Sequence, residues 1–294
     1  MSSSIENLIL SILQQEIDKS IKIEKQKMLG GGCINNAMHL KTSHGDFFLK
    51  YNQNCPPDLF LREAESLQEL AKPDSGLQIP KVFAATELHE QQPAVLLTEY
   101  LPSGSGGKKQ DETLAHGLAT IHKYSAEKYG FYHDNYCGAT EQNNQWNHNW
   151  IDFFANQRIG YLVKLIAKDR QLSNMDHDIY EKLIDKLPDL LTHEVYPSLV
   201  HGDLWSGNYM NTSNGPAIID PACSYSDREF DLAITNMFGG FSEIFWSAYH
   251  EAYPLQPGWK ERNNLYMLYH YLNHYYLFGG AYGQQALQIA KNFI

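Results

Sequence analysis

Residues 199–208 read LVHGDLWSGN, and a second segment, residues 218–221, reads IIDP. Asp203 and Asn208 lie five positions apart, and Asp220 follows a predicted hairpin that turns at residues 212–216. In kinases one Asp accepts the proton of the substrate hydroxyl, while an Asn five residues later and an Asp beyond a hairpin hold metal ions. The alternative is a polar turn in which Asp203 caps a helix. Residue types and spacing together favour a site that places magnesium under a triphosphate.

A glycine-rich turn lies far upstream of these segments. It comprises Gly30, Gly31, Gly32, Cys33, Ile34 and Asn35, between two predicted strands. Such a turn can lay backbone N–H groups over phosphates. It matches GxGxxG only in part, because Asn35 takes the place of the third glycine. Taken alone it could be an ordinary hairpin turn, but its position one hairpin before Lys50 favours nucleotide binding.

Lys50 ends an apolar strand, where a kinase places the lysine that pairs with the α- and β-phosphates. The alternative is a solvated lysine at a strand end. A helix is predicted to follow, with Asp58 as its cap, and Glu63 shares the apolar face of that helix. Glu65 lies about 200° further round, toward solvent. We therefore expect Glu63, rather than Glu65, to pair with Lys50.

The length and the charge limit the class of protein. At about 150 residues per domain, 294 residues suggest two domains and a large core. The chain has 34 acidic and 23 basic residues, a formal net charge of −11. We therefore expect no nucleic-acid partner, because binding to phosphates needs clustered Lys and Arg. An acidic surface suits amine-bearing substrates instead.

The cysteines and the N-terminal segment indicate a soluble protein of a reducing compartment. No two of the four cysteines have CxxC spacing, so neither a zinc site nor a redox dithiol is predicted. Residues 5–13 have helical apolar spacing with Glu6 among them, unlike a signal peptide. No run of about 18 uncharged apolar residues occurs, so we expect no membrane association and a cytoplasmic location.

The order of the patterns predicts an α+β fold with two lobes. Strand patterns dominate residues 1–101, which we expect to form a small antiparallel sheet with one main helix. Residues 102–107, PSGSGG, are the most linker-like stretch of the chain. Residues 102–294 are expected to form a larger, mainly helical lobe. Its predicted helices are 111–124, 146–167, 176–190, 228–238, 242–253 and 260–278.

Several other residues have both a functional and a structural interpretation. Trp205 lies two positions from Asp203 and could form a wall for a sugar, or equally anchor the loop. Arg158 is a candidate for substrate binding. Asp231 belongs with Asp227 and Glu229 to an acidic cluster that could contact substrate or have a structural role. His270 and His274 are four apart on a helix; without a third ligand, packed histidines are expected.

Five segments together resemble one known family. They read HGDLWSGN, IDPACSYSDREFDLA, GGGCIN, FGGFSEIFWSAY and LYHYLNH. Over roughly residues 5–290 the chain is similar to the fructosamine-3-kinase (ketosamine-3-kinase) family. That resemblance implies the two-lobe protein-kinase-like fold that the family shares with aminoglycoside and choline kinases. The sequence Asp220-Pro221 departs from the DFG of protein kinases, which argues against a protein-kinase activation loop.

The resemblance also implies a role for each matching residue. Lys50 and Glu63 would form the ion pair, Asp203 would be the base, and Asn208 and Asp220 would bind magnesium. In this fold an Asp at the position of Asp231 supports the backbone of the 201–208 loop, and we expect that role here. Glu99, Tyr100 and Leu101 match the hinge between the lobes, whose backbone would bind the adenine of ATP.

The expected activity is transfer of phosphate from ATP to the 3-hydroxyl of a ketosamine, as a small molecule or on a glycated protein lysine. The rivals are a kinase of another hydroxylated amine, of aminoglycoside or choline type, and a nucleotide-binding regulator without phosphotransfer. Cys33, in the glycine-rich turn, could make the protein sensitive to oxidation. A monomer or a redox-linked dimer is expected.

Overall fold

One antiparallel sheet organises the first hundred residues. The computed structural model describes residues 3–30, 35–90, 92–170 and 172–294. Five strands pair in the order β1-β2-β3-β5-β4, and every pairing is antiparallel. The elements of this part are α1 (Ser3–Glu16), β1 (Ile23–Leu29), β2 (Asn36–Thr42), β3 (Gly45–Asn52), α2 (Leu59–Leu70), β4 (Val82–Thr86) and β5 (Ala94–Glu99).

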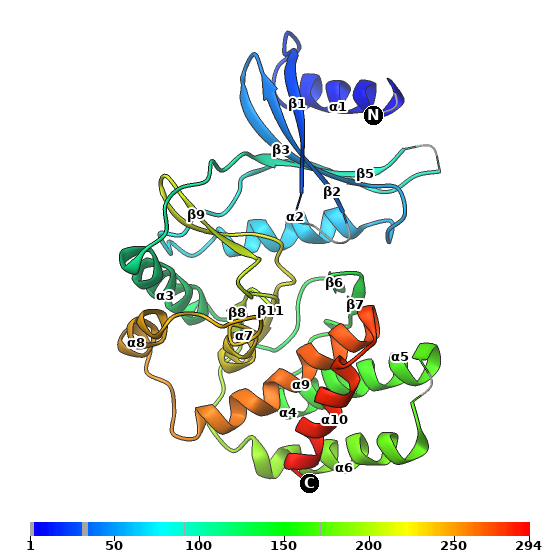
Figure 1. The fold of residues 1–294 in the computed structure, drawn as a ribbon, viewed down its shortest axis with the longest axis vertical. Helices are drawn as coiled ribbons and strands as arrows, with labels where there is room; N and C mark the ends of the chain where they lie inside the picture. The colour runs from blue at the N-terminus through cyan, green and yellow to red at the C-terminus, as the bar shows by residue number, and fades with distance from the viewer. Residues whose placement is uncertain (1–2, 31–34, 91, 171) are drawn as a thin grey trace.

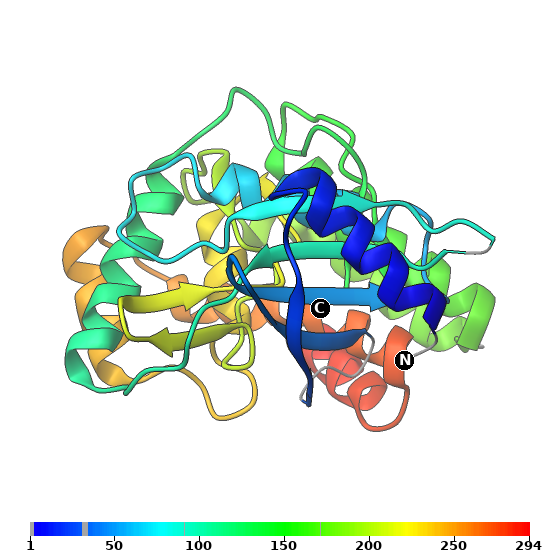
Figure 2. The ribbon, with the colours of Figure 1, turned by 90° about the horizontal axis from the view of Figure 1, so that it is seen from above.

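A helix covers each face of this sheet (Figure 1). Val95 and Leu97 of β5 pack with Ile9 and Leu13 of α1. The alternate residues of the same strand, such as Leu96, belong to a second cluster with α2. The side chains of a strand alternate between the two faces of a sheet, so each strand contributes to two small cores. Seen from above, α1 crosses the strands at an angle (Figure 2).

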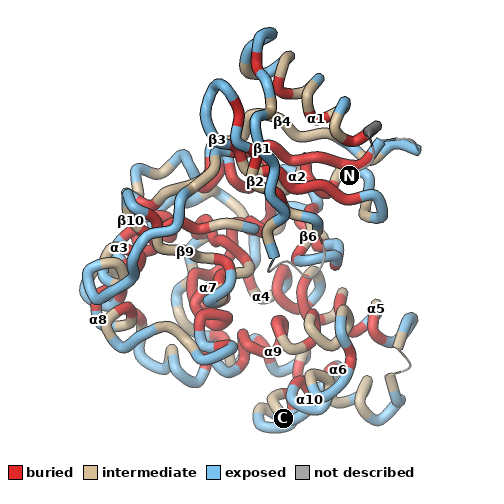
Figure 3. Tube along the Cα trace, turned by 45° about the horizontal axis from the view of Figure 1, so that its top comes forward, coloured by how far each residue is buried: buried red, intermediate tan, exposed pale blue. Residues whose placement is uncertain are grey.

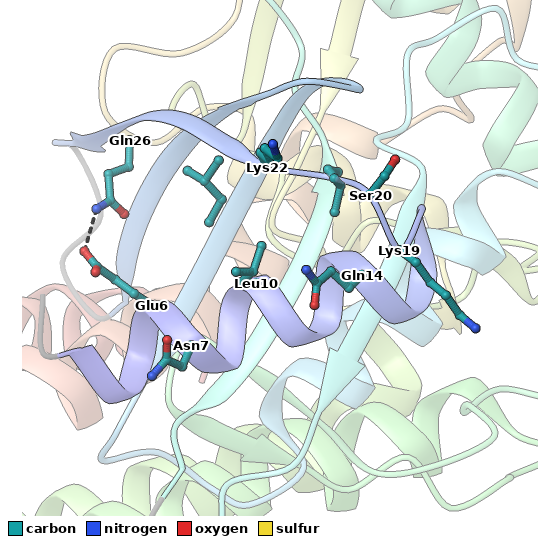
Figure 4. Close-up of a pocket in the computed structure, with 10 residues that line it drawn as sticks. Glu6, Asn7, Leu10, Gln14, Lys19, Ser20, Lys22 and Gln26 are labelled. Atoms are coloured by element: carbon teal, nitrogen blue, oxygen red, sulfur yellow. Dashed lines mark hydrogen bonds between the residues drawn. The ribbon is translucent and has the colours of Figure 1, made fainter.

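A surface groove lies between α1 and the edge strand β1. It is lined by residues of α1 and of segment 19–26, and Gln26 Nε2 donates to Glu6 Oε1 across it at 2.7 Å (Figure 4). The groove is on the α1 side of the sheet. Lys50 points to the opposite side, so this groove is not part of the site described below.

The segment predicted to be a linker is tied to the rest of the protein. The N–H of Gly104 donates to Asn211 O at 2.7 Å, and Ser103 forms a β-bridge with Thr212. A Cβ at Gly104 would lie 2.4 Å from the carbonyl carbon of Thr212, so the close approach requires glycine. Residues 102–107 therefore do not behave as a free tether.

The rest of the chain is mainly helical, around one large core (Figures 1 and 3). Its helices are α3 (Lys108–Lys123), α4 (Trp150–Phe153), the π-helix η1 (Phe154–Ile159), α5 (Gly160–Arg170), α6 (Asn174–Leu190), α7 (Arg228–Ile234), α8 (Glu243–Ala252), α9 (Trp259–Phe278) and α10 (Tyr282–Asn292). Its short strands are β6 (Asn135–Cys137), β7 (Thr140–Gln142), β8 (Ser198–Val200), β9 (Tyr209–Thr212), β10 (Gly215–Ile218) and β11 (Ser224–Ser226). The α+β expectation is confirmed.

Three local expectations were wrong. The helix expected at 146–167 begins at Trp150 and contains the π-helix. The last helix, α10, was missed, because Gly279 and Gly280 have positive φ and end the periodic pattern. Asp58 does not cap α2 with its side chain. Its carboxylate instead accepts hydrogen bonds from Arg62 Nε at 2.8 Å and Tyr136 OH at 2.7 Å.

No helix in the described part of the chain is both long and apolar enough to cross a bilayer.

Candidate active site

Lys50 reaches Glu63 because of the alternation along β3. Phe47 and Leu49 point into the α1 cluster, so Lys50 points to the other face, where α2 packs. The Lys50 ammonium donates to Glu63 Oε1 at 2.6 Å, and Lys50 as a whole is 6% exposed. The expected contact between Lys50 and Glu63 is confirmed.

Asp220 also accepts a hydrogen bond from the Lys50 ammonium. Burial lowers the pKa of Lys50, but the charges of Asp220 and Glu63 outweigh it, and the net pKa is raised. Burial raises the pKa of the Glu63 carboxyl against the opposing charge of Lys50. A permanently charged ammonium therefore stands where the sheet meets the helical part.

Asp203 and Asn208 are joined within one loop. Asn208 Nδ2 donates to the backbone oxygen of Asp203 at 2.8 Å and to its carboxylate Oδ2 at 2.9 Å. Burial, followed by the nearby charge of Asp220, raises the pKa of the Asp203 carboxyl well above its usual value, and the Asn208 hydrogen bond opposes this. The loop thus holds a half-buried carboxylate whose pKa is affected by a second, more exposed one.

Asp231 holds the backbone of this loop through hydrogen bonds, as expected. It is fully buried and accepts the backbone N–H groups of His201 and Gly202, each at 2.8 Å. Gly202 has φ +83°, and a Cβ there would lie 2.1 Å from the backbone oxygen of Ala222. His122 Nε2 bonds the same Asp231 carboxylate at 3.1 Å. The loop therefore has a fixed backbone shape before any substrate binds.

The hinge and part of the glycine-rich turn lie within the described residues. Gly30 and Asn35 are the first and last residues of the turn, and Asn52 Nδ2 donates to Asn35 Oδ1 at 2.8 Å. Gly31, Gly32 and Cys33 lie outside the described residues. In the hinge, residues 99–101, the Tyr100 ring stacks on His39 of β2, with ring centroids 3.8 Å apart. The backbone of residues 99–101 is the segment expected to hold adenine, and the stacked rings join it to β2.

The helix that carries Glu63 is bound to the helical part at several points, none of which the sequence revealed. Glu69 accepts a hydrogen bond from Tyr225 OH at 2.7 Å, and His133 Nδ1 meets Glu65 Oε1 at 2.8 Å. Glu65 therefore lies on the face opposite Lys50, as expected, but it contacts a histidine instead of open solvent. These bonds hold α2, and with it Glu63, in one position.

Arg158 is not exposed to a substrate. It is fully buried, and its guanidinium donates to Asn143 O at 2.8 Å and Asn144 Oδ1 at 2.7 Å. It also lies over the Phe153 ring. The substrate-binding expectation for Arg158 is contradicted by this burial, because the guanidinium is closed off from solvent and both of its terminal nitrogens donate to the protein itself. Trp205, by contrast, is only half-buried and lies in the loop of Asp203.

One other acidic cluster brings three possible metal ligands together. Among the described residues these are His193, Asp227 and Glu229. Arg262 forms two hydrogen bonds to Glu229, at 2.7 and 2.8 Å, and Tyr266 OH donates to Asp227 at 2.6 Å. The arginine charge already balances the cluster, which we therefore read as part of the structural core.

The oxygen atoms near Asp220 suit a hard divalent cation better than the cluster of His193, Asp227 and Glu229 does. Ile219 N donates to Asn208 O at 2.9 Å, which brings Asn208 beside Asp220. Because Asn208 Nδ2 is turned to Asp203, its Oδ1 is the atom available to a cation. A carboxylate and an amide oxygen are the ligands that Mg²⁺ prefers.

A carboxylate bonded to an amide, a lysine paired with an acid, and a second carboxylate lie between an antiparallel sheet and a helical lobe, which is the arrangement of a phosphotransferase with the protein-kinase-like fold. The fructosamine kinase family model matches residues 5–294. The chain belongs to the fructosamine kinase family. It is thus a phosphotransferase with an alcohol acceptor, and the resemblance seen in the sequence is confirmed.

Curated relatives and solved structures agree with this family. The chain is 38% identical to a chloroplastic protein-ribulosamine 3-kinase of Arabidopsis thaliana, covering 94% of this chain and 84% of the relative. It is 36% identical to a probable ketoamine kinase of Synechocystis, covering 95% and 93%. A crystal structure of a putative fructosamine-3-kinase from Haemophilus somnus matches with a TM-score of 0.87 and 26% identity, covering 97% and 96%.

The fold is also found in more distant kinases. An aminoglycoside phosphotransferase in complex with AMP-PNP and hygromycin B has a TM-score of 0.66 at 15% identity, covering 96% of this chain and 98% of the other. At that identity the likeness shows the fold alone. The expected two-lobe protein-kinase-like fold is confirmed, and ATP is the phosphate donor that the kinase family implies.

Proposed function

We propose that this protein is an ATP- and magnesium-dependent kinase that phosphorylates the 3-hydroxyl of ketosamines such as ribulosamine and fructosamine adducts. The observation that carries the proposal is the arrangement of Asp203, Asn208, Asp220 and Lys50 in a chain of this family. The names of the relatives support the substrate class. The intact set of four argues against a regulator without phosphotransfer.

Each residue has a role in this proposal. Asp203 orients the acceptor hydroxyl and accepts its proton as the new bond to phosphorus forms. Lys50, held by Glu63, binds the α- and β-phosphates, and backbone N–H groups of residues 30–35 cover them. Asn208 and Asp220 would hold magnesium, which supplies positive charge to the transferred phosphoryl group. The backbone of residues 99–101 binds adenine.

The product explains what such a reaction achieves. A phosphate on C3 is adjacent to the C2 carbonyl and β to the carbon that bears the amine. It is a good leaving group, and its elimination leads to release of the amine. Phosphorylation of a ketosamine, free or on a protein lysine, would therefore remove the sugar.

The proposal includes the organisation of the protein. Residues 1–101 form the nucleotide-binding lobe in this proposal, and residues 102–294 form the catalytic and substrate lobe. The protein is located in the cytoplasm. The protein is either a monomer or a dimer linked through Cys33, and gel filtration with and without reductant distinguishes the two. A Cys33→Ala variant that dimerises like the wild type under oxidation would contradict the linked form.

The test is a screen of acceptors with ATP and magnesium. ADP release is measured with ribulosamine, erythrulosamine and fructosamine adducts, an aminoglycoside and choline, and phosphorus–proton NMR locates the phosphate. We expect ketosamines to be phosphorylated on C3, with ribulose adducts turned over at least as well as fructose adducts. Preference for the aminoglycoside or choline, attachment at another carbon, or no turnover would overturn the proposal.

A further inference from the structure

A row of aromatic side chains extends from the loop of Asp203 over the surface of the helical lobe. The Trp205 and Phe238 rings meet edge to face, with centroids 5.2 Å apart. His274 lies 5.4 Å from Phe238, and Phe278 lies 5.8 Å from His274. We call these four residues the aromatic strip. It joins the Asp203 loop to the segment after α7 and to the end of α9.

The strip is exposed where phenylalanine is usually buried. Phe238 is 49% exposed and Phe278 is 54% exposed. Across the part of the chain that the structure describes, they are the phenylalanines with the most open surface. Exposed apolar patches of this kind commonly mark surfaces for ligands or partners.

Phe238 is also held in a strained backbone conformation. Its φ is +53°, in the left-handed region that bulky residues rarely adopt. Within the described residues, Asp220 is the other non-glycine residue with a positive φ, and it lies at the reacting end of the site. Backbone strain of this kind concentrates at functional sites. Here it turns the Phe238 ring toward Trp205.

Trp205 connects the strip to the reacting atoms. Its N–H donates to Asp203 O at 3.1 Å, and its carbonyl accepts from Asn208 N at 2.9 Å. Its ring lies over Gly207, where a Cβ would come within 2.2 Å of the ring. Gly207 thus permits one close-packed position of the indole, two residues from the base.

The strip presents no positive charge. His274 Nδ1 donates to His270 O at 2.8 Å, and burial lowers the pKa of the His274 ring, which is neutral at pH 7. Neutral aromatic faces attract cations and also bind aliphatic chains. In a ketosamine the secondary ammonium is carried by C1, two carbons from the accepting hydroxyl on C3. With the 3-hydroxyl held at Asp203, the amine substituent begins two carbons away, and Trp205 is the member of the strip that lies in the Asp203 loop.

We propose that Trp205, Phe238, His274 and Phe278 form a subsite for the amine-side substituent of the ketosamine, an aliphatic or aromatic group on the secondary ammonium. This inference rests on the proposed function. The subsite determines which amine adducts of one sugar are preferred. A long side chain, such as that of lysine, gains contacts along the strip that a short one cannot reach.

The test uses ribulose adducts of methylamine, butylamine and phenethylamine. For the wild type we expect kcat/KM to rise about tenfold from the methyl to the longer adducts, mainly through a lower KM. In Phe238→Ala and Phe278→Ala this ratio falls to about two. Phe238→Tyr, which keeps a ring, retains the ratio. Tyr196→Ala, which removes an exposed ring that lines a separate pocket, also retains it.

The outcomes separate the two proposals. A wild type that phosphorylates no ketosamine overturns the proposed function, and the subsite with it. A wild type that phosphorylates all three adducts equally, or a ratio that survives loss of both rings, overturns the subsite alone. Phe278 lies at the exposed end of α9, so its variant keeps the test valid should Phe238→Ala fail to fold.

Discussion

The ammonium of Lys50 and the carboxylate of Asp220, 170 positions apart in the chain, are bonded to each other. Lys50 also donates to Glu63, so carboxylates from the two lobes meet at one buried cation. The two functional ends of the site are therefore aligned before a nucleotide binds. Groups that are already in place require little reorganisation during the reaction.

Lys50→Ala should lower kcat by about 10²–10³-fold, the usual effect of removing one group that stabilises developing charge. Glu63→Gln should reproduce part of that loss, because it releases the ammonium. Glu65→Gln is the matched control on the same helix and should stay within about threefold, since Glu65 contacts His133 on the other face. Steady-state kinetics measures all three. Equal losses in the two Glu variants would refute the assignment of Glu63.

Asp203→Asn should lower turnover roughly 10²–10⁴-fold while ATP binds as in the wild type. The amide oxygen can still accept the hydrogen bond from Asn208, so the loop keeps its shape, but the amide cannot take the proton. Ser206→Ala, at an exposed position of the same loop, is the control. Turnover close to that of the wild type would remove Asp203 from the role of base.

Asp220→Asn should weaken the binding of magnesium–ATP more than the binding of ATP without metal. The amide carries no charge for the cation, whereas the nucleotide contacts proposed for Lys50 and residues 99–101 do not involve the Asp220 charge. Calorimetric titration with and without magnesium gives both affinities. Unchanged magnesium–ATP affinity would show that the metal is held elsewhere.

His270 should make the protein less stable in acid. Burial lowers its pKa from 6.5 to about 3, and the ring is 1% exposed. Below pH 6.5 the unfolded chain binds a proton that the folded one excludes. The free energy of unfolding therefore decreases as the pH is lowered, by up to about 1.4 kcal/mol per pH unit between the two pKa values.

His270→Leu should reduce that slope between pH 6 and 4, as measured by urea unfolding, whatever its effect at pH 7. His177→Gln, on α6 with its side chain 41% exposed, should leave the slope unchanged. The same slope in His270→Leu as in the wild type would mean that His270 has the same pKa in the folded and unfolded states, which would contradict the lowered pKa.

Short-range patterns in the sequence determined the chemistry-bearing parts. The apolar run that Lys50 ends predicted the strand β3, and the helical spacing of Glu63 put it on the face of α2 that meets Lys50. The distance of five residues from Asp203 to Asn208 is set within one loop. Such features depend on the periodicity of the backbone, which is local, so the sequence carries them directly.

Only the tertiary structure decided what covers each face. Asp220 is bonded to Lys50, Glu65 is bonded to His133, and Arg158 is fully buried. In each case segments that are distant in the chain pack together. Periodicity states that a face is buried and does not name the partner that buries it. The positive φ of Phe238 has the same origin: surrounding contacts hold a conformation that a bulky residue does not favour on its own.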